Sequence, residues 1–138
     1  MIVVDSSVWI AQLRAQSSPA VAALSGMPSP TRIIVGDLVL MEVLRGARDE
    51  RHAESLERAM RRFSVEPMVD VALALAAARH SRFLRGRGVT IRKTIDLLIA
   101  TFCIERGHAL LHQDRDFDLM AQHLPLAIAR TPPSPALG

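Results

Sequence analysis

The sequence predicts an α/β protein, a three-layer α/β/α sandwich around a short, mostly parallel central sheet. Two observations predict it. Short apolar and β-branched runs, each long enough only for a buried strand, alternate along the chain with stretches of helical periodicity. With 138 residues, of which 49% are hydrophobic and 22% charged, the chain suits one compact domain with a single core. We therefore expect strands that are covered by helices on both faces.

Most expected elements are bounded by a turn or capping residue. Ser18-Pro19 and Gly26 provide the N-cap, first-turn proline and C-terminal glycine of a short helix. Asp70 likewise indicates a helix start, and Gly107 a helix end. The elements expected in chain order are a strand at 2–4, helices at about 6–13 and 19–25, a loop at 27–31, a strand at 32–35, helices at 37–45 and 49–62, a strand at 63–66, helices at 70–84 and 90–106, a strand at 109–111, a short helix, and a strand at 124–129. Residues 1–130 would form a single domain, and the proline-rich segment 131–138 is expected to be a flexible tail.

Charge is unevenly distributed along the chain. Lys93 is the only lysine, so sixteen of the 17 basic residues are arginine. Between residues 45 and 93, twelve basic residues stand against six acidic ones, whereas acids outnumber bases by eight to five elsewhere. Guanidinium groups hold phosphates in two-point contacts, so this basic segment is compatible with nucleic-acid binding. Genomic base composition explains the shortage of lysine equally well, and both interpretations stay open.

Nothing in the sequence indicates export or membrane insertion. No apolar run approaches the roughly 20 residues of a bilayer span, and Asp5 interrupts the apolar N-terminus. Cys103 is the only cysteine, which excludes an internal disulfide and fits a reducing compartment. We expect a soluble, cytoplasmic protein that does not contact a membrane.

Five carboxylates lie where a soluble protein usually avoids them, either after expected buried strands or within apolar helices. They are Asp5, Glu42, Asp96, Asp114 and Asp116. Because the carboxyl ends of parallel strands meet at one edge of a sheet, Asp5 and the segment 112–116 should lie close together. Converging carboxylates repel one another unless a cation binds between them, and Mg²⁺ or Mn²⁺ prefers oxygen ligands. The pattern therefore favours a divalent metal site.

Taken singly, each acid has a simpler explanation. Asp5, Asp96 and Asp114 can each cap a helix. Glu42 can lie on a solvated helix face. These explanations do not account for the recurrence of Asp, Glu, Asp and Asp, in that order, at successive strand ends and helix starts.

In this order and spacing, the acids resemble those of the PIN-domain ribonucleases, and within them the VapC-type toxins of bacterial toxin–antitoxin pairs. The resemblance extends from residue 2 to about 129 and implies a PIN-like fold. The segments that carry it are IVVDSSVWI, VLMEVLRG, TIDLLIATFCIERG and LLHQDRDFD. It implies that Asp5, Glu42 and Asp96 ligate Mg²⁺ or Mn²⁺. The fourth acid varies within the family; we favour Asp114 because it comes first after the strand, with Asp116 close enough to contribute through water.

Four further residues are candidate supporting residues, each with a simpler alternative. Ser6 or Ser7 can hydrogen-bond an acid or a metal-bound water, or can cap the following helix. Thr94 can orient Asp96 or touch a phosphate, or can be an N-cap. His112 can reach the site or be purely structural.

The resemblance implies a Mg²⁺-dependent endoribonuclease toxin that cleaves structured RNA, such as tRNA or rRNA, by attack of a metal-activated water on a phosphodiester. It also implies a homodimer, and a cognate VapB-type antitoxin whose tail fills the acidic groove. The basic segment 45–93 would hold the RNA backbone. Two alternatives stay open, a non-catalytic arginine-rich RNA-binding module and a PIN-type nuclease acting on DNA. A phosphatase of the haloacid dehalogenase type is disfavoured, because Ser7 stands where it needs a second Asp.

Overall fold

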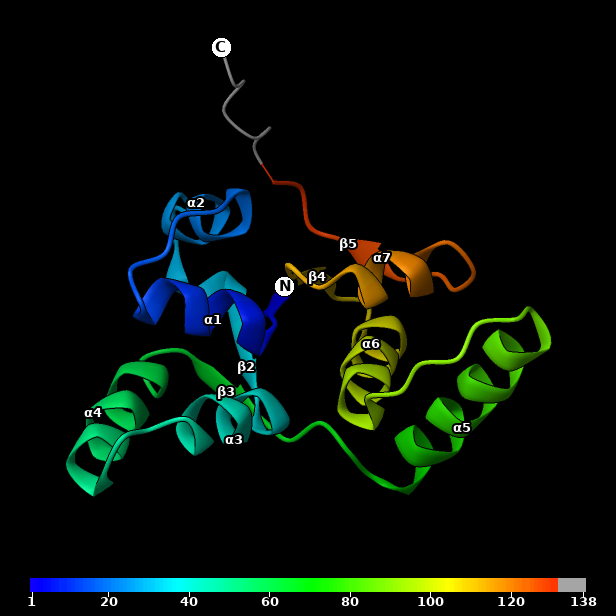
Figure 1. Cartoon of the computed structure of the whole chain (residues 1–138), viewed down its shortest axis with the longest axis horizontal. Coiled ribbons are helices and arrows are strands. Elements are labelled where there is room, and N and C mark those ends of the chain that lie inside the picture. Colours follow the sequence, from blue (N-terminus) through cyan, green and yellow to red (C-terminus); the bar gives the residue numbers. More distant parts are fainter. Residues whose placement is uncertain (132–138) are drawn as a thin grey trace, which may run out of the picture.

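A five-stranded parallel sheet forms the middle layer of the molecule (Figure 1). The computed structural model describes residues 1–131. In spatial order the strands are β3 (Ser64–Glu66), β2 (Ile33–Gly36), β1 (Ile2–Val4), β4 (Ala109–Leu111) and β5 (Ala127–Ile128). Every neighbouring pair is parallel, and Ile2 of β1 is in register with both Ile33 and Ala109. The sheet, expected to be mostly parallel, is entirely parallel within the described residues.

Helices cover the two faces of the sheet and complete the three layers (Figure 1). One face carries α1 (Ser6–Leu13), α2 (Pro19–Ser25), α3 (Asp37–Arg45) and α4 (Glu50–Met60), and the other carries α5 (Val71–Gly86), α6 (Thr94–Arg106) and α7 (Arg115–Ala121). Within the first layer α1 packs against α2 and α3, and within the second α6 packs against α5 and α7. The expected α/β/α sandwich is confirmed.

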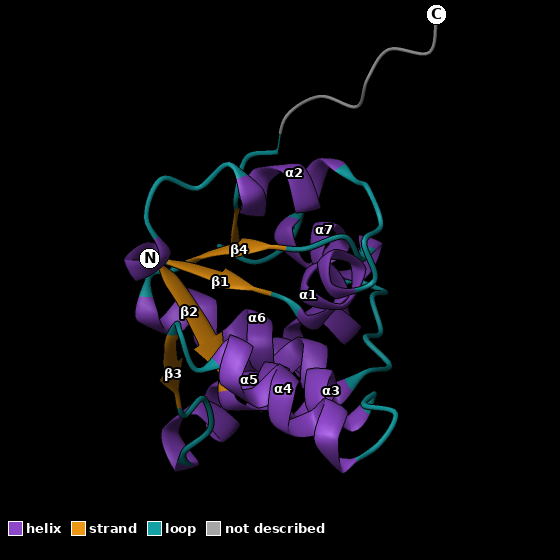
Figure 2. Ribbon diagram, turned by 90° about the vertical axis from the view of Figure 1, so that its left-hand side faces the viewer, coloured by secondary structure: helices purple, strands orange, loops and turns teal. Residues whose placement is uncertain are grey.

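The chain adds strands to one side of β1 first and then to its other side, beginning with β4. From β1 it steps through β2 to β3 by way of α1–α4, then returns by way of α5 and α6 to β4, on the other side of β1. Right-handed crossovers require the helices to change faces when the direction of stepping reverses. Figure 2 shows β1 and β4 side by side, running toward the same edge. Their carboxyl ends mark the topological switch point, where α/β sheets bind ligands.

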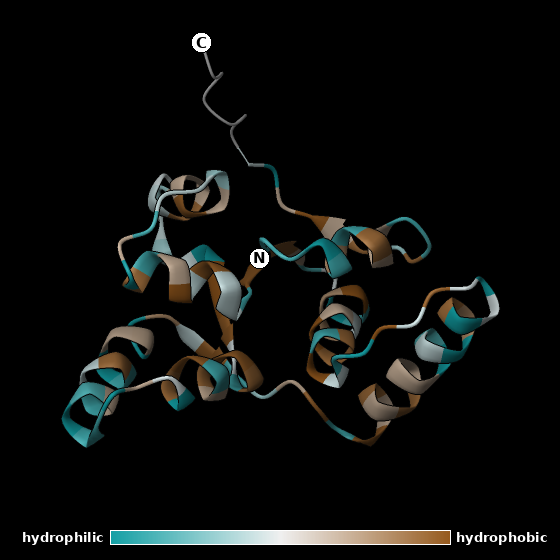
Figure 3. Cartoon of the chain, viewed as in Figure 1, coloured by the Kyte–Doolittle hydropathy of each residue, from teal (hydrophilic) through white to brown (hydrophobic). Residues whose placement is uncertain are grey.

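The hydrophobic core lies on both sides of the central strands. Val3 and Val4 of β1, Val35 of β2, and Leu110 and Leu111 of β4 have no exposed surface. Figure 3 shows hydrophobic residues along the inner strands and hydrophilic residues on the outer side of α4. Strands that are buried on both faces need continuous apolar sequences, which is why such strands can be recognised in the sequence.

Two elements differ from the expectation by three residues or more at one end. The helix expected at 90–106 begins only at Thr94, because Lys93 is its N-cap and Ile91 packs against the core in the irregular segment before it. The last strand is Ala127–Ile128 rather than 124–129, since β5 pairs only with Ala109 and Leu110.

Two further sequence predictions concern the tail and membrane contact. The tail predicted at 131–138 lies outside the described residues apart from Thr131. Within the described residues, no helix combines the length and the apolar character that crossing a bilayer requires.

Candidate functional site

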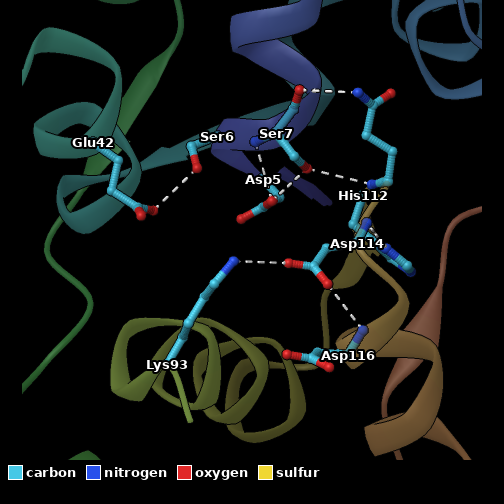
Figure 4. Close-up of polar contacts among 9 residues, drawn as sticks. Asp5, Ser6, Ser7, Glu42, Lys93, His112, Asp114 and Asp116 are labelled. Carbon is cyan, nitrogen blue, oxygen red and sulfur yellow. Dashed lines mark hydrogen bonds and ion pairs between the residues drawn. The ribbon is translucent and has the colours of Figure 1, made fainter. Parts of the chain in front are cut away.

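Four of the predicted carboxylates converge on one cleft at the switch point. Asp5 directly follows β1, and its backbone N–H donates to the carbonyl of Leu111 at the end of β4 (2.9 Å). Glu42 reaches the cleft from α3, and Asp96 from the first turn of α6. The cleft has a volume of about 460 Å³ and is lined by Asp5, Ser6, Ser7, Ile10, Glu42, Arg45, Lys93, Thr94, Ile95, Asp96 and Asp114. Figure 4 shows how Glu42, Asp5 and Asp114 approach this space from different elements.

Asp116 lies beside this group rather than among the residues that line the cleft. One carboxylate oxygen from each of Asp96, Asp114 and Asp116 lies within 4.8 Å of the other two. Asp116 belongs to the first turn of α7, whose N-cap is Asp114, and its backbone N–H donates to Asp114 Oδ1 (3.0 Å). The structure thus keeps both predicted candidates for the fourth acid within reach of Asp96.

Two of the carboxylates are deeply buried and incompletely hydrogen-bonded. Asp5 is 3% exposed and Asp96 6% exposed. Asp5 Oδ1 and Asp96 Oδ2 are inaccessible to solvent and have no hydrogen-bond partner among the described residues. A buried anionic oxygen without a partner is costly, because desolvation is not offset by any contact. This arrangement leaves two carboxylate oxygens free to accept a cation.

Burial and mutual repulsion make the carboxyl groups hard to ionise in the metal-free protein. Burial raises the pKa of Asp5 and of Glu42 above their usual values. Burial, with the negative charges of Asp5 and Asp114, raises the pKa of Asp96 to about 7. A cation that binds carboxylates stabilises their ionised form and so removes this penalty.

The donor set fits a hard divalent cation. Mg²⁺ and Mn²⁺ take carboxylate and water oxygens, and the described residues near the cleft offer only carboxylates as strong ligands, without a thiolate or an imidazole lining it. The unpartnered oxygens of Asp5 and Asp96 are the observation that supports this fit. Asp5, Glu42, Asp96 and Asp114 line the cleft and could hold the ion, and Asp116 lies beside Asp96 and Asp114.

Comparison with known proteins identifies the family. The PIN domain family model matches residues 2–122. The chain belongs to the PIN domain family. Ribonuclease VapC11 of Mycobacterium tuberculosis and a VapC ribonuclease of Mycobacterium bovis are each 34% identical to it over 124 residues, which is 88% of this chain and 92% of theirs.

Solved structures share the fold of this PIN domain. VapBC2 from Rickettsia felis, bound to a promoter DNA fragment, matches with a TM-score of 0.75 and 16% identity over 94% of this chain and 98% of that chain. Mycobacterium tuberculosis VapC20, a sarcin-ricin loop cleaving toxin, matches with a TM-score of 0.65 and 20% identity over 92% and 99%. At these identities the likeness concerns the fold alone.

The two serines of this PIN domain hold carboxylates rather than cap the helix. Ser6 Oγ donates to Glu42 Oε1 (3.1 Å), and Ser7 Oγ donates to Asp5 Oδ2 (2.5 Å) (Figure 4). The N-cap of α1 is Asp5, which accepts from the Ser7 backbone N–H (3.1 Å). The interpretation of Ser6 or Ser7 as the cap is therefore wrong. Asp5 combines both of its predicted roles, because Oδ2 caps the helix while Oδ1 has no partner among residues 1–131.

Thr94 and Asp96 also lie in the cleft without capping α6. The N-cap is Lys93, whose side chain makes no capping bond, so the interpretation of Thr94 or Asp96 as a cap is wrong. Lys93 Nζ instead lies 3.4 Å from Asp114 Oδ2 (Figure 4). The carboxylates of Asp114 and Asp96 raise the pKa of this lysine. Lys93 thus partly neutralises the acidic cleft.

His112 does not line the cleft. Its Nδ1 accepts from the Asp114 backbone N–H (3.0 Å), its Nε2 lies 3.2 Å from Asp118 Oδ1, and its ring packs on Phe117. The imidazole therefore shapes the turn that presents Asp114, in agreement with the structural alternative.

Gln113 is a residue of the site that the sequence did not indicate. Its backbone N–H donates to Ser7 Oγ (3.3 Å) and its Nε2 to the Ser7 carbonyl (3.3 Å). Its Oε1 accepts from Ser18 Oγ (2.8 Å) at the N-cap of α2. Gln113 thereby connects the end of β4 to α1 and α2, next to the Ser7–Asp5 hydrogen bond. An exposed glutamine carries no pattern from which this contact could be predicted.

The basic segment expected at 45–93 is not one surface. Its arginines are divided mainly between α4 and α5, which lie in opposite outer layers (Figure 1). Arg45 and Lys93 are the members of the segment that line the acidic cleft. The expectation that this segment holds the RNA backbone stays a prediction.

Proposed function

We propose that this PIN domain is a Mg²⁺- or Mn²⁺-dependent endoribonuclease and a growth-inhibiting toxin of the VapC type. Curated relatives at 34% identity are named VapC ribonucleases. We further propose structured RNA, such as a tRNA or rRNA, as its substrate. A relative in fold, VapC20, is described as a toxin that cleaves the sarcin-ricin loop.

The observation that carries the proposal is the pair of buried, unpartnered oxygens, Asp5 Oδ1 and Asp96 Oδ2, in a cleft with Asp114 and Glu42. A divalent ion bound there lowers the pKa of a water ligand and offsets charge that develops on a phosphate. Ser6 and Ser7 hold Glu42 and Asp5 in fixed orientations. Lys93 stands at the rim, where its ammonium offers a second positive charge to an incoming phosphate.

We also propose a VapB-type antitoxin as partner, a homodimer as the assembled form and the cytoplasm as the place of action. Structures with this fold include the VapBC complexes of Rickettsia felis and Salmonella typhimurium. An arginine of the antitoxin would pair with the carboxylates of the cleft and compete with the metal, because guanidinium–carboxylate contacts are bidentate and charge-assisted.

The test compares Asp96→Asn with Glu105→Gln, an exposed acid near the other end of the same helix. Each protein is expressed in a bacterial host, then purified and incubated with total RNA in Mg²⁺ or EDTA. Wild type and Glu105→Gln should arrest growth and cleave RNA only with Mg²⁺, and Asp96→Asn should do neither.

Two outcomes would contradict the proposal. Arrest by Asp96→Asn that equals wild type would indicate a non-catalytic RNA-binding module. Cleavage of DNA but not of RNA would indicate a nuclease with a different substrate.

A further inference from the structure

A second hollow of about 280 Å³ adjoins the acidic cleft and has the opposite charge. It is lined by Ile10, Leu13, Arg14, Val43, Gly46, Arg48, His52 and Leu56, so none of the described residues that line it is acidic. Ile10 also lines the acidic cleft, so the two spaces are neighbours. The hollow lies where α1, the end of α3 and α4 meet.

Its floor and rim differ in chemistry. Ile10, Leu13, Val43 and Leu56 give it apolar walls, and Arg14, Arg48 and His52 supply polar groups that donate hydrogen bonds. His52 Nδ1 accepts from the Arg48 backbone N–H (3.0 Å), so its Nε2 carries the proton in the neutral ring.

The two arginines have no fixed anionic partner among the residues that the structure describes. Both are exposed, and neither forms an ion pair with a carboxylate of residues 1–131. By contrast, Arg61 pairs with Glu57 of α4. Guanidinium forks beside an apolar wall suit a phosphate with an attached base, because the fork binds the phosphate in two-point contacts while the base packs on carbon.

The position of the hollow beside the acidic cleft suits an RNA strand that occupies both spaces. Asp5 and Arg14 cap opposite ends of α1, which has eight residues and is therefore about 12 Å long. A stacked strand advances about 3.4 Å per nucleotide. The hollow therefore lies a few nucleotides away from a phosphate at the carboxylates.

We propose that this hollow is a nucleotide subsite, in which Arg14, Arg48 and His52 bind the phosphate of a flanking nucleotide in a single-stranded stretch of the substrate RNA. The proposal rests on the proposed function for its substrate class. An acidic segment of a protein partner is the competing occupant. RNA is favoured because the hollow continues directly from a cleft suited to a divalent cation.

The test measures binding of a fluorescein-labelled oligouridylate decamer in EDTA, by anisotropy at several salt concentrations. The double variant Arg14→Gln/Arg48→Gln removes two charges from the hollow. Its matched control, Arg58→Gln/Arg82→Gln, removes two exposed arginines elsewhere on α4 and α5. The first should weaken binding at least about fivefold and reduce the slope of log K against log salt by about 0.7, because one phosphate is no longer neutralised. The control should change neither to this extent.

A third variant, Arg14→Lys/Arg48→Lys, keeps the charge but not the guanidinium fork, so it should retain the slope and lose part of the affinity. A misfolded variant would lose both the salt dependence and the affinity, so this variant also distinguishes misfolding from the loss of the guanidinium contacts. Equal weakening in the two glutamine variants would overturn the proposal in favour of diffuse attraction. Tighter binding of decaglutamate than of the RNA, abolished in Arg14→Gln/Arg48→Gln, would assign the hollow to an acidic peptide.

The binding test does not depend on cleavage. If wild type binds the decamer through the hollow but cleaves no RNA, the proposed function fails and the subsite stands. If the wild type cleaves RNA and the variants bind the decamer as tightly as the wild type, the subsite proposal is wrong and the proposed function stands.

Discussion

Asp96 combines deep burial with a strongly raised pKa. The side chain is among the buried polar residues, and its pKa lies at about 7 against an ordinary 3.8. Between pH 3.8 and about pH 7, the Asp96 carboxyl group is protonated in the folded chain and ionised in the unfolded chain. The stability of the metal-free protein therefore falls as the pH rises through this window, and the loss is complete above pH 7.

We expect the Tm of the wild type in EDTA to fall between pH 5 and pH 8 by roughly 5 °C more than the Tm of Asp96→Asn. The Tm of Asp96→Asn should still fall with rising pH, but less steeply, because the pKa values of Asp5 and Glu42 are raised as well. Thermal unfolding across the pH range checks this. Parallel curves for the two proteins would show that Asp96 ionises normally.

Ser7 contacts Asp5, one of the proposed metal ligands, and Gln113 contacts Ser7. Removal of the Ser7 hydroxyl frees Asp5 Oδ2, and removal of the Gln113 amide frees the Ser7 carbonyl from its hydrogen bond. We expect Ser7→Ala to lower Mn²⁺ affinity about tenfold and Gln113→Ala several-fold, since groups behind metal ligands typically contribute about 10–100-fold. Calorimetric titration with Mn²⁺ measures this. Gln122→Ala, which removes an exposed amide at the end of α7, is the control, and equal affinities in all four proteins would refute the role.

The sequence could indicate the acids but not their neighbours. Asp5 and Asp114 follow apolar strands, and an acid in that position is visible in the sequence. Gln113 acts through tertiary contacts at an exposed position, where any polar residue is compatible with the local pattern. Ser6 and Ser7 are candidates on the sequence alone, but the partner of Ser6, Glu42, depends on where α3 lies.

At the scale of elements, α1 has a favourable cap at its start and a strained backbone after its end. Its start is capped by Asp5, but it is followed by Ala15 at φ 55°, in the left-handed region where a side chain is strained. Gly107, the C-cap of α6, also lies in this region at φ 70°. The sequence places glycine at one of these positions and alanine at the other.

We expect Ala15→Gly to raise the free energy of unfolding by about 1 kcal/mol and Gly107→Ala to lower it by about the same amount. A Cβ at Gly107 would meet no atom within 4 Å, so only backbone strain opposes it. Urea unfolding measures both changes. A loss of stability in Ala15→Gly would mean that the strain is offset by contacts of the alanine methyl.

Helix starts were predictable where a side chain caps them. Ser18, Asp49 and Asp70 each accept a backbone N–H at the starts of α2, α4 and α5. The start of α6 was placed too early, because Lys93 makes no capping bond and the preceding apolar residues match the helical period. Spacing alone does not locate a helix start.

At the scale of the whole molecule, the acids join the two helical layers. Asp5 and Glu42 belong to the part of the chain that builds α1–α4, and Asp96 and Asp114 to the part that builds α6 and α7. An ion between them therefore opposes separation of the layers.

We expect Mg²⁺ to slow hydrogen exchange of backbone amides in the first turns of α1, α6 and α7 together, and to raise the Tm of the whole domain. Hydrogen exchange with mass spectrometry, with and without EDTA, measures this, and Asp96→Asn is the control. Protection confined to α7 would place the ion at Asp114 and Asp116 alone.

The layered fold followed from the alternation of strands and helices, but the order of the strands did not. The sequence of a strand does not show which other strands pair with it. The position of the sheet between α4 and α5 therefore could not be predicted. The contiguous basic segment was a property of the sequence rather than of the surface.

The pairing of β1 with β4 also bears on synthesis. The first strand of the chain receives its neighbour β4 only after residue 109 has been made. At about 5–20 residues per second, a ribosome needs roughly 5–20 s between Asp5 and Asp114. Throughout that time the nascent chain holds some of the acids without the others, so a truncated product has no complete site. An RNA-cleaving chain built in this order would lack its complete site, and so would spare the ribosome that makes it, until Asp114 has been made.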